Sequence, residues 1–164
     1  MGYTNLYLTP KDPDFVPTIE DRVAAERFIE DWSGENCVES GPSFKTSDCQ
    51  MYFGSFPERL VCPVCNTVLD VYDEELDEWA YDLQEHLYSS RDARILRVTM
   101  PCCKTEIGAQ QLSLESDEKN STTRFGRFSI YIHDARDNAF SKDELEQLSS
   151  ILKCNIFQFT ESGT

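Results

Sequence analysis

Two close pairs of cysteines constrain the fold of this chain more than any other feature of its sequence. Cys62 and Cys65 flank a Pro-Val dipeptide, whereas Cys102 and Cys103 are adjacent and follow a proline. Zinc prefers tetrahedral thiolate and imidazole ligands, and a tight Cys-x-x-Cys turn presents two thiolates from one rigid loop. The two pairs together would complete a closed four-thiolate site. We therefore expect one structural Zn²⁺ ion at Cys62, Cys65, Cys102 and Cys103.

The adjacency of the second pair leaves alternatives open. Neighbouring cysteines reach one ion only with an unusual local backbone, so the fourth ligand could instead be His133, His86 or Cys49. The cysteines could also be small buried hydrophobic residues. A third interpretation takes Cys-Pro-x-Cys as a thioredoxin-like dithiol. That interpretation needs a helix that begins at the nucleophilic cysteine, whereas the residues from Asn66 to Leu69 look extended.

Composition limits the number of domains and the compartment. A chain of 164 residues with 40% hydrophobic residues fits one globular domain. No apolar run approaches the roughly 20 residues of a membrane span, and the N-terminus lacks a secretory signal. Seven cysteines are an odd number, so a reducing, cytoplasmic location is expected rather than a disulfide framework. The cysteines outside the two pairs, Cys37, Cys49 and Cys154, are expected to serve in packing.

Hydrophobic periodicity predicts an α+β fold. Helical patterns start at Thr18, around Leu76 and at Ser141, where Glu144 completes a capping box. About six short strands are expected between them, including one at 3–8 and one at 128–132, while residues 33–48 read as a loop. The prediction is one α+β domain over residues 1–164. It has a mixed or antiparallel sheet, about three helices and a zinc-ribbon-like metal insert at about 60–106.

Four short motifs run through the chain: an N-terminal Y-x-N-L-Y-L strand, C-P-x-C, P-C-C and a C-terminal acidic capping box. Their residues are Tyr3, Asn5, Leu6, Tyr7 and Leu8; Cys62, Pro63 and Cys65; Pro101, Cys102 and Cys103; and Ser141, Asp143, Glu144 and Leu145. Over most of its length the chain thus resembles a family of uncharacterised bacterial zinc-ribbon-like proteins. The resemblance implies a fold and a metal but no reaction. The family has Gly after each cysteine pair, where this chain has Asn66 and Lys104, and Lys adopts a left-handed conformation poorly.

Acidic residues dominate the surface chemistry. The formal net charge is −15 and the sequence pI is about 4.4. Such a charge repels nucleic-acid phosphates and anionic lipid, and favours a basic protein as partner. Acids gather around the predicted second helix, with Tyr72 and Tyr81 as candidate aromatic anchors. The candidate partner-binding residues are Glu74, Glu75, Asp77, Glu78, Asp82 and Glu85. Solubility alone is the alternative explanation for these acids.

Catalytic signatures are missing from the sequence. Nucleophilic catalysis needs a Cys or Ser with a His and an orienting acid, and His86 and His133 are the only histidines. Both are expected to be structural. The sequence therefore predicts a non-enzymatic, zinc-stabilised module that binds a basic protein, as an immunity protein or an inhibitor of a cationic toxin does. A nucleic-acid-associated zinc ribbon, and a metal-dependent or redox enzyme, are the alternatives.

Overall fold

The computed structural model describes residues 3–36, 38, 41–54, 56–90, 92–115, 125–135 and 138–163. Contacts divide the chain into two compact units: unit 1 comprises residues 1–48 and 126–164, and unit 2 comprises residues 49–125. Three α-helices and antiparallel strand pairs form within the described part, which confirms the α+β prediction. The metal insert expected at about 60–106 falls within unit 2.

Unit 1 is built from one sheet and two helices. Its elements in chain order are β1 (Tyr3–Pro10), α1 (Ile19–Glu35), β2 (Pro42–Tyr52), β8 (Phe125–Ile132), α3 (Lys142–Leu152) and β9 (Ile156–Gly163). The strand order is β2-β8-β1-β9, and β1 is antiparallel to both of its neighbours. A βαββαβ chain with this strand order has the ferredoxin-like arrangement. Unit 2 interrupts it between the strands β2 and β8.

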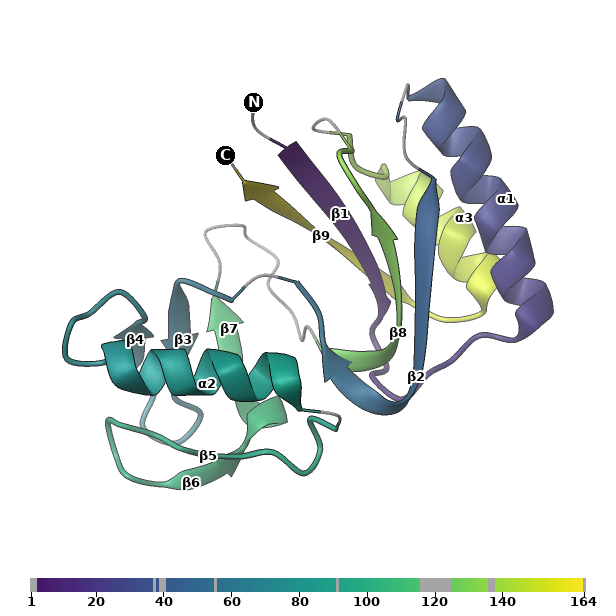
Figure 1. Cartoon of the computed structure of the whole chain (residues 1–164). Coiled ribbons are helices and arrows are strands. Elements are labelled where there is room, and N and C mark those ends of the chain that lie inside the picture. Colours follow the sequence, from purple (N-terminus) through teal and green to yellow (C-terminus); the bar gives the residue numbers. More distant parts are fainter. Residues whose placement is uncertain are drawn as a thin grey trace. The chain divides into compact units, whose positions relative to one another are not determined.

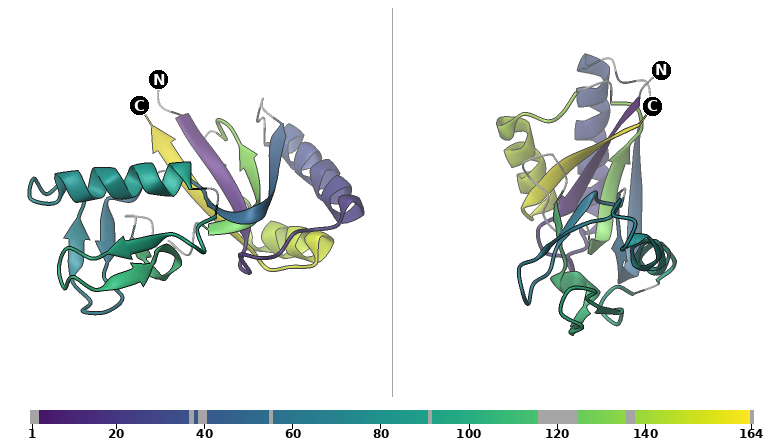
Figure 2. Two further views of the ribbon diagram at one scale, coloured as in Figure 1. Left: turned by 60° about the horizontal axis from the view of Figure 1, so that its bottom comes forward. Right: turned by 90° about the vertical axis from the view of Figure 1, so that its left-hand side faces the viewer.

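Both helices of unit 1 cover the same face of the sheet (Figure 1, Figure 2). Alternation along the strands explains why, because successive side chains point to opposite faces. Leu6 and Leu8 of β1 and Ile130 of β8 are fully buried and pack against Ile29 of α1 and Leu148 of α3. Burial of such side chains contributes roughly 1.5 to 3 kcal/mol each. This apolar layer is what holds the two helices on the sheet.

Side-chain caps set where these helices begin. The Thr18 hydroxyl accepts a hydrogen bond from the backbone N–H of Asp21 at 3.2 Å. Ser141 and Glu144 form the predicted capping box: the Ser141 N–H donates to Glu144 Oε2 at 2.7 Å, and the Glu144 N–H donates to Ser141 Oγ at 3.2 Å. These bonds satisfy amides that the first helical turn leaves without partners. Both helix starts predicted from the sequence are confirmed.

Unit 2 contains two small sheets and one helix. Its elements are β3 (Arg59–Val61), β4 (Val68–Asp70), α2 (Asp77–Ser89), β5 (Arg97–Thr99), β6 (Glu106–Gly108), the 3₁₀ turn η1 (Ala109–Gln111) and β7 (Ser113–Glu115). One sheet has the order β4-β3-β7, and the other pairs β5 with β6. The buried face of α2 carries Ala80, Leu83 and Leu87, as its periodicity predicts. These side chains share one apolar cluster with buried residues of both sheets.

The prediction of a loop at residues 33–48 is wrong at both ends. Helix α1 continues to Glu35, and strand β2 begins at Pro42. Strand β2 is an edge strand of the sheet, and its first half exposes polar side chains, so no apolar alternation marks it. Phe44 is the exception, and it packs against Phe128 with ring centroids 6.1 Å apart. No described helix is long and apolar enough to cross a membrane.

Candidate metal centre

The first cysteine pair lies in the turn that joins β3 to β4. The Cys62 N–H donates to the Thr67 carbonyl at 3.0 Å, and the Asn66 N–H donates to the Cys62 carbonyl at 2.9 Å. Asn66 has a φ of 60°, in the left-handed region. This backbone folds the turn tightly enough to bring both thiols to one side. The chain continues into strand β4 rather than a helix, which removes the helix N-terminus that activates a thioredoxin-like dithiol.

The second pair lies in an equivalent turn between β5 and β6. The Met100 N–H donates to the Thr105 carbonyl at 2.9 Å, and the Lys104 N–H donates to the Met100 carbonyl at 2.9 Å. Lys104 has a φ of 60°, the same as Asn66. The structure therefore gives Lys104 the left-handed conformation that a lysine disfavours. Lys104 closes the second turn as Asn66 closes the first.

The two turns are structural repeats with an offset of 38 residues, from Cys62 to Met100. Each turn carries the sequence Pro-x-Cys-x-Thr, with Cys65 and Cys103 as its cysteine. The sequence analysis missed this repeat, although the shared motif is a signal that could have revealed it. Cys102 occupies the variable position between the Pro and the Cys of the motif, where the first turn has Val64. Counted from Met100, the second turn therefore carries its cysteines at positions three and four. Counted from Cys62, the first turn carries them at positions one and four.

The four predicted thiols lie together. The Sγ atoms of Cys62, Cys65, Cys102 and Cys103 all lie within 4.8 Å of one another, and no other described His, Cys, Asp or Glu belongs to this group. Cys62 and Cys103 are 3.8 Å apart, and Cys65 and Cys102 are 3.4 Å apart. A tetrahedral ion with metal–sulfur bonds of about 2.3 Å places its sulfurs about 3.8 Å apart. The cluster therefore has the dimensions to hold one metal ion.

Thiol pKa values differ within the cluster. Hydrogen bonds from the side chain and backbone of Thr67 lower the pKa of Cys65 to about 6. Thr105 acts in the same way in the second turn and lowers the pKa of Cys103. Loss of hydration and the neighbouring thiols, Cys65 first, raise the pKa of Cys102 to about 12. Crowded thiols thus resist joint ionisation, and a bound cation removes that resistance because it stabilises each thiolate.

The other residues considered as ligands have different environments. His133 lies in the turn directly after β8, where its Nδ1 is 2.9 Å from Asn5 Oδ1 and 3.1 Å from the Tyr131 hydroxyl. His86 Nδ1 lies 2.6 Å from the backbone carbonyl of Asp82, one turn back on α2. Cys49 is partly buried in strand β2. Among the described residues, none of these three belongs to the thiol group. Cys37 lies outside the described residues.

The predicted partner-binding acids are all exposed, as a docking surface requires. Helix α2 begins at Asp77, so Glu74 and Glu75 lie in the turn before the helix rather than on it. The reason is local: the Asp73 carboxylate accepts from the Glu75 N–H at 3.0 Å and holds that turn. Tyr72 and Tyr81, the candidate anchors, expose 76% and 62% of their surface. We call the six acids, Glu74, Glu75, Asp77, Glu78, Asp82 and Glu85, the acidic surface.

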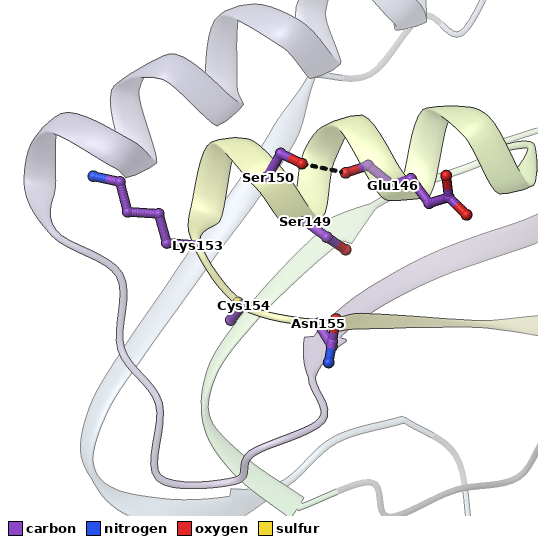
Figure 3. A pocket seen from close by; sticks show the side chains of 6 residues that line it. All are labelled: Glu146, Ser149, Ser150, Lys153, Cys154 and Asn155. Atoms are coloured by element: carbon purple, nitrogen blue, oxygen red, sulfur yellow. Dashed lines mark hydrogen bonds between the residues drawn. The ribbon is translucent and has the colours of Figure 1, made fainter.

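A hollow of ≈ 580 Å³ lies at the C-terminal end of α3 (Figure 3). Its polar groups already have structural roles. The Lys153 ammonium pairs with Asp21 at 2.8 Å, and the Ser150 hydroxyl donates to the Glu146 carbonyl at 3.0 Å. Burial, and to a smaller extent the Asp12 carboxylate, raises the pKa of Cys154 to about 11. Cys154 is therefore a neutral thiol at physiological pH, which fits its predicted packing role.

One feature that the sequence analysis missed is a row of aromatic rings on the sheet face opposite the helices of unit 1. Tyr7 stacks on Phe159 with centroids 4.9 Å apart and lies 4.9 Å from Tyr131. The registered pairs of β1 with β8 and β9 bring these rings together. Rows of this kind can stack nucleobases. The Tyr7 hydroxyl, however, donates to the Glu161 carboxylate at 3.1 Å, which places a negative charge beside the row.

Comparisons by family model, by protein sequence and by solved structure found no match to the chain. The resemblance to bacterial zinc-ribbon-like proteins therefore stays a hypothesis. Evidence about function comes from the chemistry of the chain itself: a cluster of four thiols able to hold a metal ion, and the acidic surface on the same unit.

Proposed function

We propose that this protein is a non-enzymatic, zinc-stabilised module that binds a basic protein through the acidic surface. The observation that carries the proposal is the presence, on one compact unit, of a cluster of four thiols and six exposed acids. An immunity protein or an inhibitor that neutralises a cationic toxin would act through such a surface.

Zinc is the metal that the donor set favours. Soft thiolates in tetrahedral geometry select Zn²⁺ or iron–sulfur centres, and a single ion fits the spacing of these four sulfurs. Four protein ligands fill a tetrahedral ion and leave no position for water or substrate, which is why we assign the ion a structural role. The ion would tie the turn after β3 to the turn after β5. Because these strands have only three residues each, such a tie stabilises the unit.

The charge distribution supports a basic partner. The segment from Asp70 to Glu85, which carries the acidic surface, contains no Lys or Arg. A field of this kind raises association rates by about 10- to 10³-fold, and salt weakens it. Charges at the rim of an interface speed association more than they strengthen binding. The exposed Tyr72 and Tyr81 are therefore the candidates for apolar anchoring. Among the alternatives, nucleic acid is opposed by the same charge, and a redox dithiol is opposed by the strand after Cys65.

A salt-dependent pull-down tests the proposal. Wild-type protein and a variant with Glu74→Gln, Glu78→Gln and Asp82→Asn are used as baits in lysate of the native host, at low and at high salt. The matched control neutralises three exposed acids of α1 instead, with Glu30→Gln, Asp31→Asn and Glu35→Gln. We expect wild type and control to retain a basic protein at low salt, and the acidic-surface variant to lose it. An acidic partner, or equal retention by all three proteins at every salt concentration, contradicts the proposal.

A further inference from the structure

Two adjacent hollows flank Trp79 on unit 2. One, of ≈ 420 Å³, is lined by the start of α2 and by the turn after β5. The other, of ≈ 330 Å³, is lined by the middle of α2 and by β5 itself. Trp79, Asp82 and Thr99 line both hollows. The indole Nε1–H donates to the Thr99 carbonyl at 2.9 Å, which fixes the ring against β5.

The first hollow combines three features that suit one kind of side chain. Glu75, Glu78 and Asp82 provide carboxylates, opposed within the hollow by the single cation Lys104. Leu76 and Pro101 add apolar surface along which an aliphatic stem can lie. The indole of Trp79 lines the same hollow, and an indole is the aromatic group that attracts a cation most strongly. In the second hollow the charge is more balanced, because Arg97 is present and pairs with Glu106 at 3.2 Å.

We propose that the hollow beside Trp79 binds an arginine side chain presented by the basic partner. Arginine fits better than lysine because its planar guanidinium stacks on an indole and meets a carboxylate through two parallel hydrogen bonds. This inference rests on the proposed function and locates the recognition site within it. It also connects the partner site to the metal centre, because Met100, Pro101 and Lys104 belong to the same turn as Cys102 and Cys103.

The test uses the whole, zinc-loaded protein and three synthetic heptapeptides, capped at both ends, in which glycine alternates with arginine, lysine or citrulline. Binding is followed by the indole N–H signals in ¹⁵N–¹H spectra, since the chain has only two tryptophans. Trp32 is buried against Phe140 in unit 1 and serves as the internal reference. Trp79→Phe assigns the second signal. We expect the arginine peptide to shift the Trp79 signal in a saturable manner, and the neutral citrulline peptide to bind at least about tenfold more weakly.

Two matched acid pairs decide where the peptide binds. Glu75→Gln with Glu78→Gln removes two carboxylates from the hollow, whereas Asp77→Asn with Glu85→Gln removes two exposed carboxylates outside it. Both variants have the same net charge. We expect the first pair to weaken the arginine peptide at least about fivefold more than the second, and the lysine peptide to bind more weakly than the arginine peptide.

Several results would overturn the inference. Equal weakening by both acid pairs with no movement of the Trp79 signal would mean that the whole acidic surface acts as a diffuse field. Equal binding of lysine and arginine peptides would remove arginine as the recognised group. An absence of peptide binding at low salt would also reject the hollow. In each case the proposed function stands or falls separately, on whether a basic protein is retained in the pull-down.

Discussion

Met100 occupies in the second cysteine turn the place that Cys62 occupies in the first. Each backbone N–H donates to the carbonyl of the threonine five residues later, at 2.9 Å and 3.0 Å, and each side chain is fully buried. Met100 is therefore a core residue at a position where the repeat has a ligand. Cys102 makes up the missing thiol from two residues further on, which explains why this chain has adjacent cysteines.

This equivalence predicts a rescue of metal binding. Cys102→Ser removes one thiol and should lower zinc retention, whereas Met100→Cys with Cys102→Ser should restore four thiols in the pattern of the first turn. The rescued protein should be less stable without metal by about 1 to 3 kcal/mol, because a buried Met becomes smaller. Cobalt titration checks the result through the tetrahedral thiolate spectrum. A double variant that binds no better than Cys102→Ser would show that the two turns are not equivalent.

The left-handed conformation of Lys104 predicts which replacements it accepts. Its φ of 60° strains any residue with a Cβ, and β-branched residues most. Lys104→Gly should therefore match or exceed the wild type in free energy of unfolding, while Lys104→Val should lose about 1 to 2 kcal/mol. Urea unfolding of the zinc-loaded proteins measures both. Equal losses for Gly and Val would mean that the lysine side chain, rather than the backbone angle, matters at this position.

Acid should abolish one contact between α1 and α3. The hydrogen bond from the Lys153 ammonium lowers the pKa of Asp21 below its ordinary value of 3.8. A carboxyl whose pKa is lowered on folding adds stability above its unfolded pKa and loses it as pH falls through the folded pKa. Lys153→Gln should therefore unfold at lower urea than wild type at pH 6, and the difference should shrink as the pH falls through the lowered pKa of Asp21. A difference that persists in acid would refute the assignment to this pair.

The capping box of α3 predicts a contrast between two serines. Ser141→Ala removes the acceptor for the Glu144 N–H and should cost about 1 kcal/mol. Ser150→Ala is the control, because Ser150 is exposed within the same helix and bonds only a carbonyl that the helix already uses. We expect its effect to lie within about 0.5 kcal/mol of zero. Similar losses for both variants would argue against a capping role.

Sequence reasoning predicted the parts of the fold that have strong local signals. The caps at Thr18 and Ser141 and the apolar stripe of α2 produced helices where they were expected. Most of strand β2 was missed, because an edge strand can expose polar side chains and its pairing with β8 depends on residues far away in the sequence. Helix α2 begins at Asp77, one residue after the predicted start, and Glu74 and Glu75 lie in the turn before it, which Asp73 holds.

The sequence predicted which residues form the candidate site, but not the backbone that brings them together. The spacing of the cysteines indicated which four thiols would meet, and they do meet. The left-handed backbone at Lys104 in the second turn was not expected, because a lysine disfavours a positive φ. Hydrophobic periodicity also could not reveal the hollow beside Trp79, because this hollow forms only when the turn after β5 packs beside α2. Such features depend on tertiary contacts that no local pattern encodes.

The metal content of the purified protein is the sharpest test of a zinc ion held by the four thiols. Protein is expressed without added zinc, passed through a desalting column and analysed for metals, together with a Cys62→Ser, Cys65→Ser variant. We expect one zinc ion per chain in the wild type, protection of Cys62, Cys65, Cys102 and Cys103 from thiol reagents, and loss of both properties in the variant. A zinc content near zero in folded wild-type protein, with all four thiols freely titratable, would contradict it.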